Sequence, residues 1–212
     1  MTLSGSYANG FAPRDGQPLY ATLWRGCVGA WSPCLGPTGL TLIDWSGSAK
    51  HGLLTDMNPQ SDWVPSGSRY SLRFDGIDGH VVCPFVSITR GTCVSAWIKP
   101  ATLSGYQIIV SQDANTPNRN WIVGHGGVTS GALIGVDWTP SLSYMESGAT
   151  LVANAWQHIA FNRAISGMQF YINGIASGSA GAHSGSLAQF SQSTMIGSRN
   201  MAGVSSQWFS GE

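Results

Sequence analysis

The clearest alternation of apolar and polar positions lies in the segment 156–174. Trp156–Phe161 and Met168–Ile172 each alternate with a period of two, which is typical of a β-strand with one buried face. The intervening Arg163–Gly167 is rich in turn formers, and Asn173-Gly174 is the dipeptide that best fits a two-residue type I′ turn. The pattern predicts an antiparallel hairpin that continues through a tight turn into a further strand.

Shorter runs of the same kind predict the other strands. They are Val28–Trp31, Leu53–Asp56, Tyr70–Phe74, His80–Cys83, Thr92–Ile98, Gln107–Ser111, Trp121–Gly124, Ala132–Trp138, Tyr144–Glu146, Leu151–Val152 and Thr194–Gly197. Asn58–Ser68 is predicted to be a loop, and Ser177–Ser186 is predicted to be a mobile loop or a bulged edge strand. The 28 glycines and 10 prolines suit many turns better than long helices. An all-β fold follows.

Five short motifs resemble, in order, those of laminin-G-like, concanavalin-type jelly rolls. They are Asp44-Trp45-Ser46-Gly47, Leu72-Arg73-Phe74-Asp75-Gly76, the run Val94–Pro100, the hairpin 156–174 and Met195-Ile196-Gly197. The resemblance runs from about Leu40 to the C-terminus. It implies a jelly-roll sandwich of two antiparallel sheets. It also places Trp97 and Trp156 in the core and gives His158 a structural position in its strand.

The length of 212 residues suits one domain of this class. Residues 1–17 lack periodicity and are predicted to be a flexible arm, which leaves 18–212 as the jelly roll. Trp208-Phe209 resembles the start of the family's closing strand, and the sequence stops at Glu212, which implies that most of this strand is missing. An unpaired sheet edge would result, and it predicts self-association, most simply as a two-fold dimer.

The charge balance narrows the range of partners. Charged residues make up 9% of the chain and the formal net charge is zero, against roughly a quarter charged in typical soluble proteins. Nucleic acid and anionic membranes are therefore poor partners. No apolar run could span a membrane, and residues 1–16 do not resemble a signal peptide. A neutral polar surface suits contacts with sugars or packing in an assembly.

Catalytic chemistry finds little support in the sequence. A glycosidase needs two carboxyl groups about 5–10 Å apart, yet Glu146 and Glu212 are the only glutamates. The other acids lie largely in predicted turns, where aspartate is expected in any case. Three of these, Asp44, Asp75 and Asp78, are candidate calcium ligands because such turns present carboxylates and carbonyls. Turn stabilisation is their alternative role, and we predict that the protein is not an enzyme.

Trp121 and Trp138 are the tryptophans for which we predict a ligand-binding role, since the resemblance assigns Trp97 and Trp156 to the core. Each lies beside polar residues, namely Asn120, His125 and Asp137. An aromatic ring with nearby amides and carboxylates is a common way to hold a sugar. The alternative is that both indoles close off the core of the sandwich.

Two functions remain open. The first is a non-catalytic binding module for carbohydrate or adhesion. The second is a structural or decoration domain of a phage virion or another extracellular assembly, without a small ligand. A glycoside hydrolase or polysaccharide lyase is the least favoured function. Either leading function would place the protein outside the cell or on a virion.

Overall fold

A computed structural model describes residues 26–87, 91–113, 119–138, 142–164, 167–181, 190–201 and 204–212. Every regular element in these ranges is a β-strand. The same ranges contain no helix that is long and apolar enough to cross a membrane. The predicted arm, residues 1–17, lies outside the described part of the chain.

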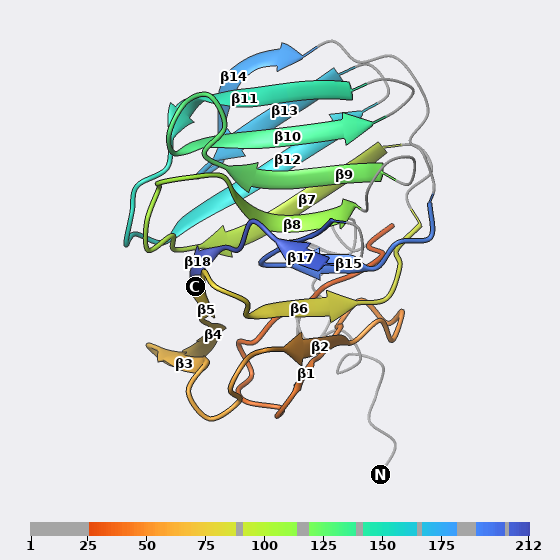
Figure 1. Ribbon diagram of the computed structural model, residues 1–212, viewed down its shortest axis with the longest axis vertical. Helices are drawn as coiled ribbons and strands as arrows, with labels where there is room; N and C mark the ends of the chain where they lie inside the picture. Colours follow the sequence, from red (N-terminus) through yellow and green to blue (C-terminus); the bar gives the residue numbers. More distant parts are fainter. Residues whose placement is uncertain are drawn as a thin grey trace, which may run out of the picture.

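The larger of two packed sheets has eight antiparallel strands (Figure 1). In spatial order these are β1 (Thr41–Leu42), β2 (Gly52–Thr55), β6 (His80–Cys83), β15 (Thr194–Ile196), β8 (Gln107–Asp113), β9 (Arg119–His125), β10 (Ala132–Trp138) and β11 (Leu142–Thr150). Strands distant in sequence pair at its centre, since Met195 of β15 lies opposite Ser111 of β8. The order of the strands in this sheet therefore depends on pairing between segments that are far apart in the sequence.

The smaller sheet contains the hairpin predicted from the sequence. Its order is β14 (Ile175–Gly181), β13 (Gly167–Ile172), β12 (Gln157–Ala164) and β7 (Gly91–Ile98). Phe161 of β12 lies opposite Phe170 of β13. Asn173 and Gly174, between β13 and β14, have φ values of 51° and 79°, as a type I′ turn requires at both central residues. The hairpin and its turn are confirmed.

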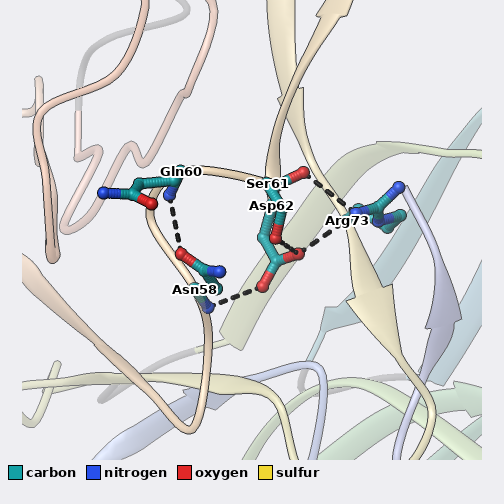
Figure 2. Close-up of polar contacts among 5 residues, drawn as sticks. All are labelled: Asn58, Gln60, Ser61, Asp62 and Arg73. Atoms are coloured by element: carbon teal, nitrogen blue, oxygen red, sulfur yellow. Dashed lines mark hydrogen bonds and ion pairs between the residues drawn. The ribbon is translucent and has the colours of Figure 1, made fainter.

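Three two-stranded ribbons complete the part of the fold that the structure describes. They are β3 (Trp63–Ser66) with β4 (Arg69–Leu72), β5 (Phe74–Asp75) with β18 (Ser210–Gly211), and β16 (Arg199–Met201) with β17 (Val204–Ser206). The loop before β3 is held by Asp62, whose carboxylate accepts the Asn58 N–H at 2.7 Å and contacts the Arg73 guanidinium at 3.4 Å (Figure 2).

Three predictions of local structure are wrong. The segment Asn58–Ser68 is not only a loop, because it contains β3. The predicted strand Tyr144–Glu146 lies within a longer strand, β11, which ends at Thr150, and Leu151–Val152 is not a strand. The segment Val28–Trp31 is not a strand, and only an isolated bridge joins Trp31 to Asp44. Pairing with a neighbouring strand decides the first two segments, since β3 pairs with β4 and β11 pairs with β10.

The core lies between the two sheets. Ile159 and Phe161 of β12 and Phe170 of β13 are at most 1% exposed. A Cβ added to Gly135 of β10 would collide with the rings of Phe161 and Phe170. The backbone of the larger sheet therefore approaches the aromatic side chains of the smaller one directly at this point.

The C-terminal residues lie between β5 and the segment that follows β7. Ser210 accepts the Ala101 N–H at 2.8 Å, and Glu212 accepts the Lys99 N–H at 2.7 Å. The Glu212 carboxylate also accepts hydrogen bonds from Lys99 Nζ at 2.8 Å and Ser71 Oγ at 2.6 Å. Among the described residues, β12 is the one strand that pairs with β7.

Candidate functional site

The side chains predicted to bind a ligand lie inside the protein. Trp121 is 4% exposed, Asn120 2%, and His125 and Asp137 are fully buried. Their strands, β9 and β10, each lie between two neighbouring strands of the larger sheet, and apolar side chains also gather on the face away from the core. The predicted surface is therefore wrong for these four residues. Trp138 ends β10, and its side chain is outside the described part of the structure.

Three of these residues, Asp137, Asn120 and His125, contact other residues inside the protein. Asp137 accepts a hydrogen bond from Arg163 Nε at 2.5 Å. The Asn120 amide donates to the Phe190 carbonyl at 2.8 Å and accepts the Phe190 N–H at 3.1 Å. Burial lowers the pKa of His125 to about 4, and its ring lies 6.1 Å from that of Phe209. These contacts stabilise the sandwich.

Both carboxylate oxygens of Asp44, a predicted calcium ligand, accept hydrogen bonds from the protein. It accepts the N–H groups of Ala30, Ser46 and Lys50 and the Ser46 hydroxyl, each at 2.9 Å. Burial alone would raise the pKa of Asp44, but these hydrogen bonds outweigh burial and lower it. A carboxylate has about four lone-pair positions. Because all four are used, Asp44 does not fit a calcium site in this arrangement.

Asp75 likewise stabilises its turn. Its Oδ1 accepts the N–H groups of Ile77, Asp78 and Gly79 at 2.8, 3.2 and 3.2 Å, while the Asp78 residue is exposed. The described residues contain no group of three His, Cys, Asp or Glu side chains that could hold a metal. Calcium at Asp75 and Asp78 stays a prediction.

The two glutamates also contact the protein itself. Glu146 accepts the Val128 N–H at 2.5 Å, a hydrogen bond from the Thr129 N–H at 3.3 Å and the Tyr144 hydroxyl. Burial and the hydrogen bond to Glu146 raise the pKa of Tyr144 to about 12. Glu146 thus holds the turn between β9 and β10, as Glu212 holds the C-terminal residues.

The smaller sheet has a solvent-facing surface on the side away from the core. Strand alternation presents eight side chains there, which we call the outer face: Cys93, Ser95, Trp97, His158, Ala160, Asn162, Gln169 and Tyr171. Their cross-strand pairs form rows, with Trp97 opposite His158 and Ser95 opposite Ala160. All eight residues are exposed or half-buried. The pleat of three neighbouring strands therefore builds this surface.

Trp97 is the most prominent aromatic side chain of the outer face, at 65% exposed. Its indole lies 5.4 Å from the His158 ring, between ring centroids, at an interplanar angle of 59°. His158 Nε2 in turn is 2.8 Å from Ser95 Oγ. The Asn162 side chain is exposed on the same face. An open indole beside hydroxyl, imidazole and amide groups is suited to stack a sugar ring and bond its hydroxyls.

The core positions predicted for Trp97 and Trp156 are therefore wrong. Trp156, directly before β12, is 38% exposed. In β7 the residues Val94, Ala96 and Ile98 turn towards the core, so Trp97 must point the other way. This alternation is visible in the sequence, but it does not by itself show which of the two faces of β7 the larger sheet covers.

A pocket of about 350 Å³ lies beside the end of β7. Its lining consists of Arg73, Phe74, Asp75, Lys99, Ala101, Asn154, Ser210, Gly211 and Glu212. The basic groups in this lining are already paired, since Lys99 contacts Glu212 at 2.8 Å and Arg73 contacts Asp62 at 3.4 Å. The pocket is thus built around contacts that hold the C-terminus.

The fold is shared with several solved structures. Domain 4 of AbnA, a GH43 extracellular arabinanase from Geobacillus stearothermophilus solved in complex with arabinotriose, superposes with a TM-score of 0.63 at 17% identity, over 87% of this chain and 89% of that one. Trypanosoma rangeli sialidase gives 0.57 at 15% identity, over 88% of this chain and 30% of that one. Domains LG4-5 of the mouse laminin α1 chain give 0.51 at 13% identity, over 66% and 38%.

At these identities the likeness shows the fold alone. No curated protein sequence matches the chain. The laminin-G family model described as the concanavalin A-like lectin/glucanases superfamily matches residues 75–212, well over half of the sequence. This region includes both sheets' central strands and the whole outer face. The chain therefore belongs to the concanavalin A-like lectin/glucanases superfamily.

Proposed function

We propose that the protein is a non-catalytic module that binds glycans through the outer face. The observation that carries this proposal is the 65% exposure of the Trp97 indole beside His158 and Ser95. Large aromatic side chains on a folded surface mark interaction sites more often than isolated aliphatic ones do. The complex of the arabinanase domain with arabinotriose supports a sugar ligand for this fold.

The outer face supplies both parts of a sugar contact. The indole of Trp97 offers a flat apolar surface for the C–H face of a sugar ring. Ser95, His158 and Asn162 offer donors and acceptors to the hydroxyl groups at the rim of that ring. Ala160 lies between the row of Trp97 and that of Asn162, and its small side chain leaves room above β12.

A glycan array probed with the wild type and Trp97→Ala tests this function. We expect the variant to lose binding by about tenfold or more, equivalent to about 1.4 kcal/mol. Ile175→Ala is the matched control, because Ile175 is 74% exposed on β14, at the opposite edge of the same sheet. Equal binding by wild type and Trp97→Ala, with both proteins folded by circular dichroism, would contradict the proposal.

A second candidate function is a structural domain that assembles through the edge of β7, as in a virion or another extracellular assembly. It is favoured by the pairing of β7 with β12 alone among the described strands. The sequence of β7, Gly91–Ile98, also carries no charged side chain that would oppose edge-to-edge pairing. A two-fold dimer would extend the smaller sheet across both copies.

Sedimentation velocity over a range of concentrations tests this assembly. A dimer should form in the wild type and weaken in Cys93→Pro. The Lys99 N–H faces this edge, and the N–H groups of Cys93, Ser95 and Trp97 face it too because the direction repeats every second residue. Proline has no N–H to donate to a second copy. A wild type that remains monomeric at high concentration would reject the edge dimer.

A further inference from the structure

We infer that the outer face takes uncharged oligosaccharides and discriminates against anionic ones. This inference rests on the glycan-binding function proposed above. None of the eight side chains that define the outer face belongs to Lys, Arg, Asp or Glu. Its polar groups are instead a serine hydroxyl, two amides, an imidazole and a phenol. Recognition there rests on neutral hydrogen bonds and on the indole.

The charged side chains closest in sequence to the outer face already form ion pairs with other residues. Lys99 follows β7 two residues after Trp97, and its Nζ is 2.8 Å from the Glu212 carboxylate. Arg163 follows Asn162 in β12, but its side chain turns into the core, is 1% exposed and contacts Asp137. Neither cation is free to meet the carboxylate of an acidic sugar.

The absence of a cation among the eight side chains of the outer face has a thermodynamic consequence. A sugar carboxylate that leaves water needs a charged or multiple hydrogen-bond partner, or its desolvation opposes binding. Sites that recognise carboxylates in proteins usually provide arginine for this reason. A neutral sugar has no such requirement, since hydroxyl groups exchange water for side-chain amides and hydroxyls at little net cost.

The distance between Trp97 and Tyr171 indicates the size of the ligand. Trp97 pairs with His158, whereas Tyr171 pairs with Ala160, so β12 separates the two aromatics and they are offset by one row. Strand spacing of about 4.8 Å and a rise of about 3.3 Å per residue put their Cα atoms roughly 12 Å apart. A single sugar ring does not span this distance, which favours an oligosaccharide over a monosaccharide.

The test uses an array of matched pairs, each a neutral oligosaccharide printed beside the same oligosaccharide carrying a sialic or uronic acid. Binding is measured at about pH 8, where histidine side chains are generally neutral. We expect the neutral member of each bound pair to be preferred by about tenfold or more. Asn162→Arg should raise binding of the acidic member, while Ile175→Arg, on the opposite edge strand, should not.

The outcomes separate this inference from the function on which it rests. Equal or tighter binding of acidic members, still lost in Trp97→Ala, would overturn the preference for neutral sugars and leave the glycan-binding function intact. Binding that is unaffected by Trp97→Ala, or no binding to any printed glycan, would overturn both. Preference for neutral members together with the reversal in Asn162→Arg supports the inference.

Discussion

Arg163 of β12 and Asp137 of β10 form a buried ion pair that joins the two sheets across the core. Arg163 Nε lies 2.5 Å from Asp137 Oδ2, and both side chains are 1% exposed. Removing one member of such a pair leaves a buried charge without its partner, which costs far more than removing both. The pair is therefore a sensitive point of the fold.

Asp137→Leu should lower the free energy of unfolding by about 3–5 kcal/mol, as measured by denaturant titration. The double variant Asp137→Leu/Arg163→Met should recover much of this loss, because no unpaired charge remains. Arg73→Met is the control, since it breaks only exposed contacts, with Asp62 and with the Ser61 carbonyl (Figure 2), and should cost at most about 1 kcal/mol. A double variant as unstable as Asp137→Leu would contradict this account.

The two tryptophans Trp121 and Trp97 should differ sharply in their contribution to stability. Trp121 is 4% exposed and belongs to the main core, so Trp121→Ala should cost about 3–5 kcal/mol through lost burial and a cavity. Trp97 is 65% exposed, and Trp97→Ala should change the unfolding free energy by less than about 1 kcal/mol. Equal losses in the two variants would show that the alternation assigned to β7 is incorrect.

His125 should make the protein sensitive to mild acid. It is fully buried, neither ring nitrogen bonds a described residue, and burial lowers its pKa from 6.5 to about 4. The unfolded chain therefore binds a proton below about pH 6.5 that the folded chain does not. Stability should fall between about pH 6.5 and pH 4, by up to about 3 kcal/mol.

Thermal unfolding of the wild type and His125→Leu across this pH range measures the effect. The variant should have a flatter pH dependence between about pH 6.5 and pH 4. Asp44 and Asp75 act in a lower pH range than His125. Burial would raise their pKa values, but hydrogen bonds outweigh burial and lower both below 3.8. The stability that these two carboxylates contribute is therefore lost at a lower pH. An identical slope in both proteins would assign the sensitivity to other groups.

Asp44 should act as a structural hydrogen-bond acceptor rather than as a calcium ligand. Asp44→Ala leaves the N–H groups of Ala30, Ser46 and Lys50 without their acceptor, and we expect a loss of about 1–3 kcal/mol. This loss should be the same in EDTA and in millimolar calcium. A calcium-dependent rise in the melting temperature of the wild type that disappears in Asp44→Ala would contradict the prediction.

The hairpin of β12 and β13 was predictable because all of its determinants are local. Ile159 and Phe161 alternate with polar or small residues, and Asn173-Gly174 has the positive φ values that a type I′ turn needs. Such signals lie within a few residues of one another and do not depend on the rest of the chain. The sandwich class was predictable for the same reason, since the motifs that indicate it are short.

The position of each tryptophan depended on tertiary structure. Trp121 and Trp97 both lie in alternating strands, and a strand alone does not say which of its faces another sheet will cover. β9 lies between β8 and β10 in the larger sheet and is buried on both faces, which hides Trp121. β7 lies at the edge of the smaller sheet with one face towards the core, which leaves Trp97 in solvent. Local sequence determined most of the strands and the turn at Asn173-Gly174, whereas long-range packing decided which face of each strand meets water.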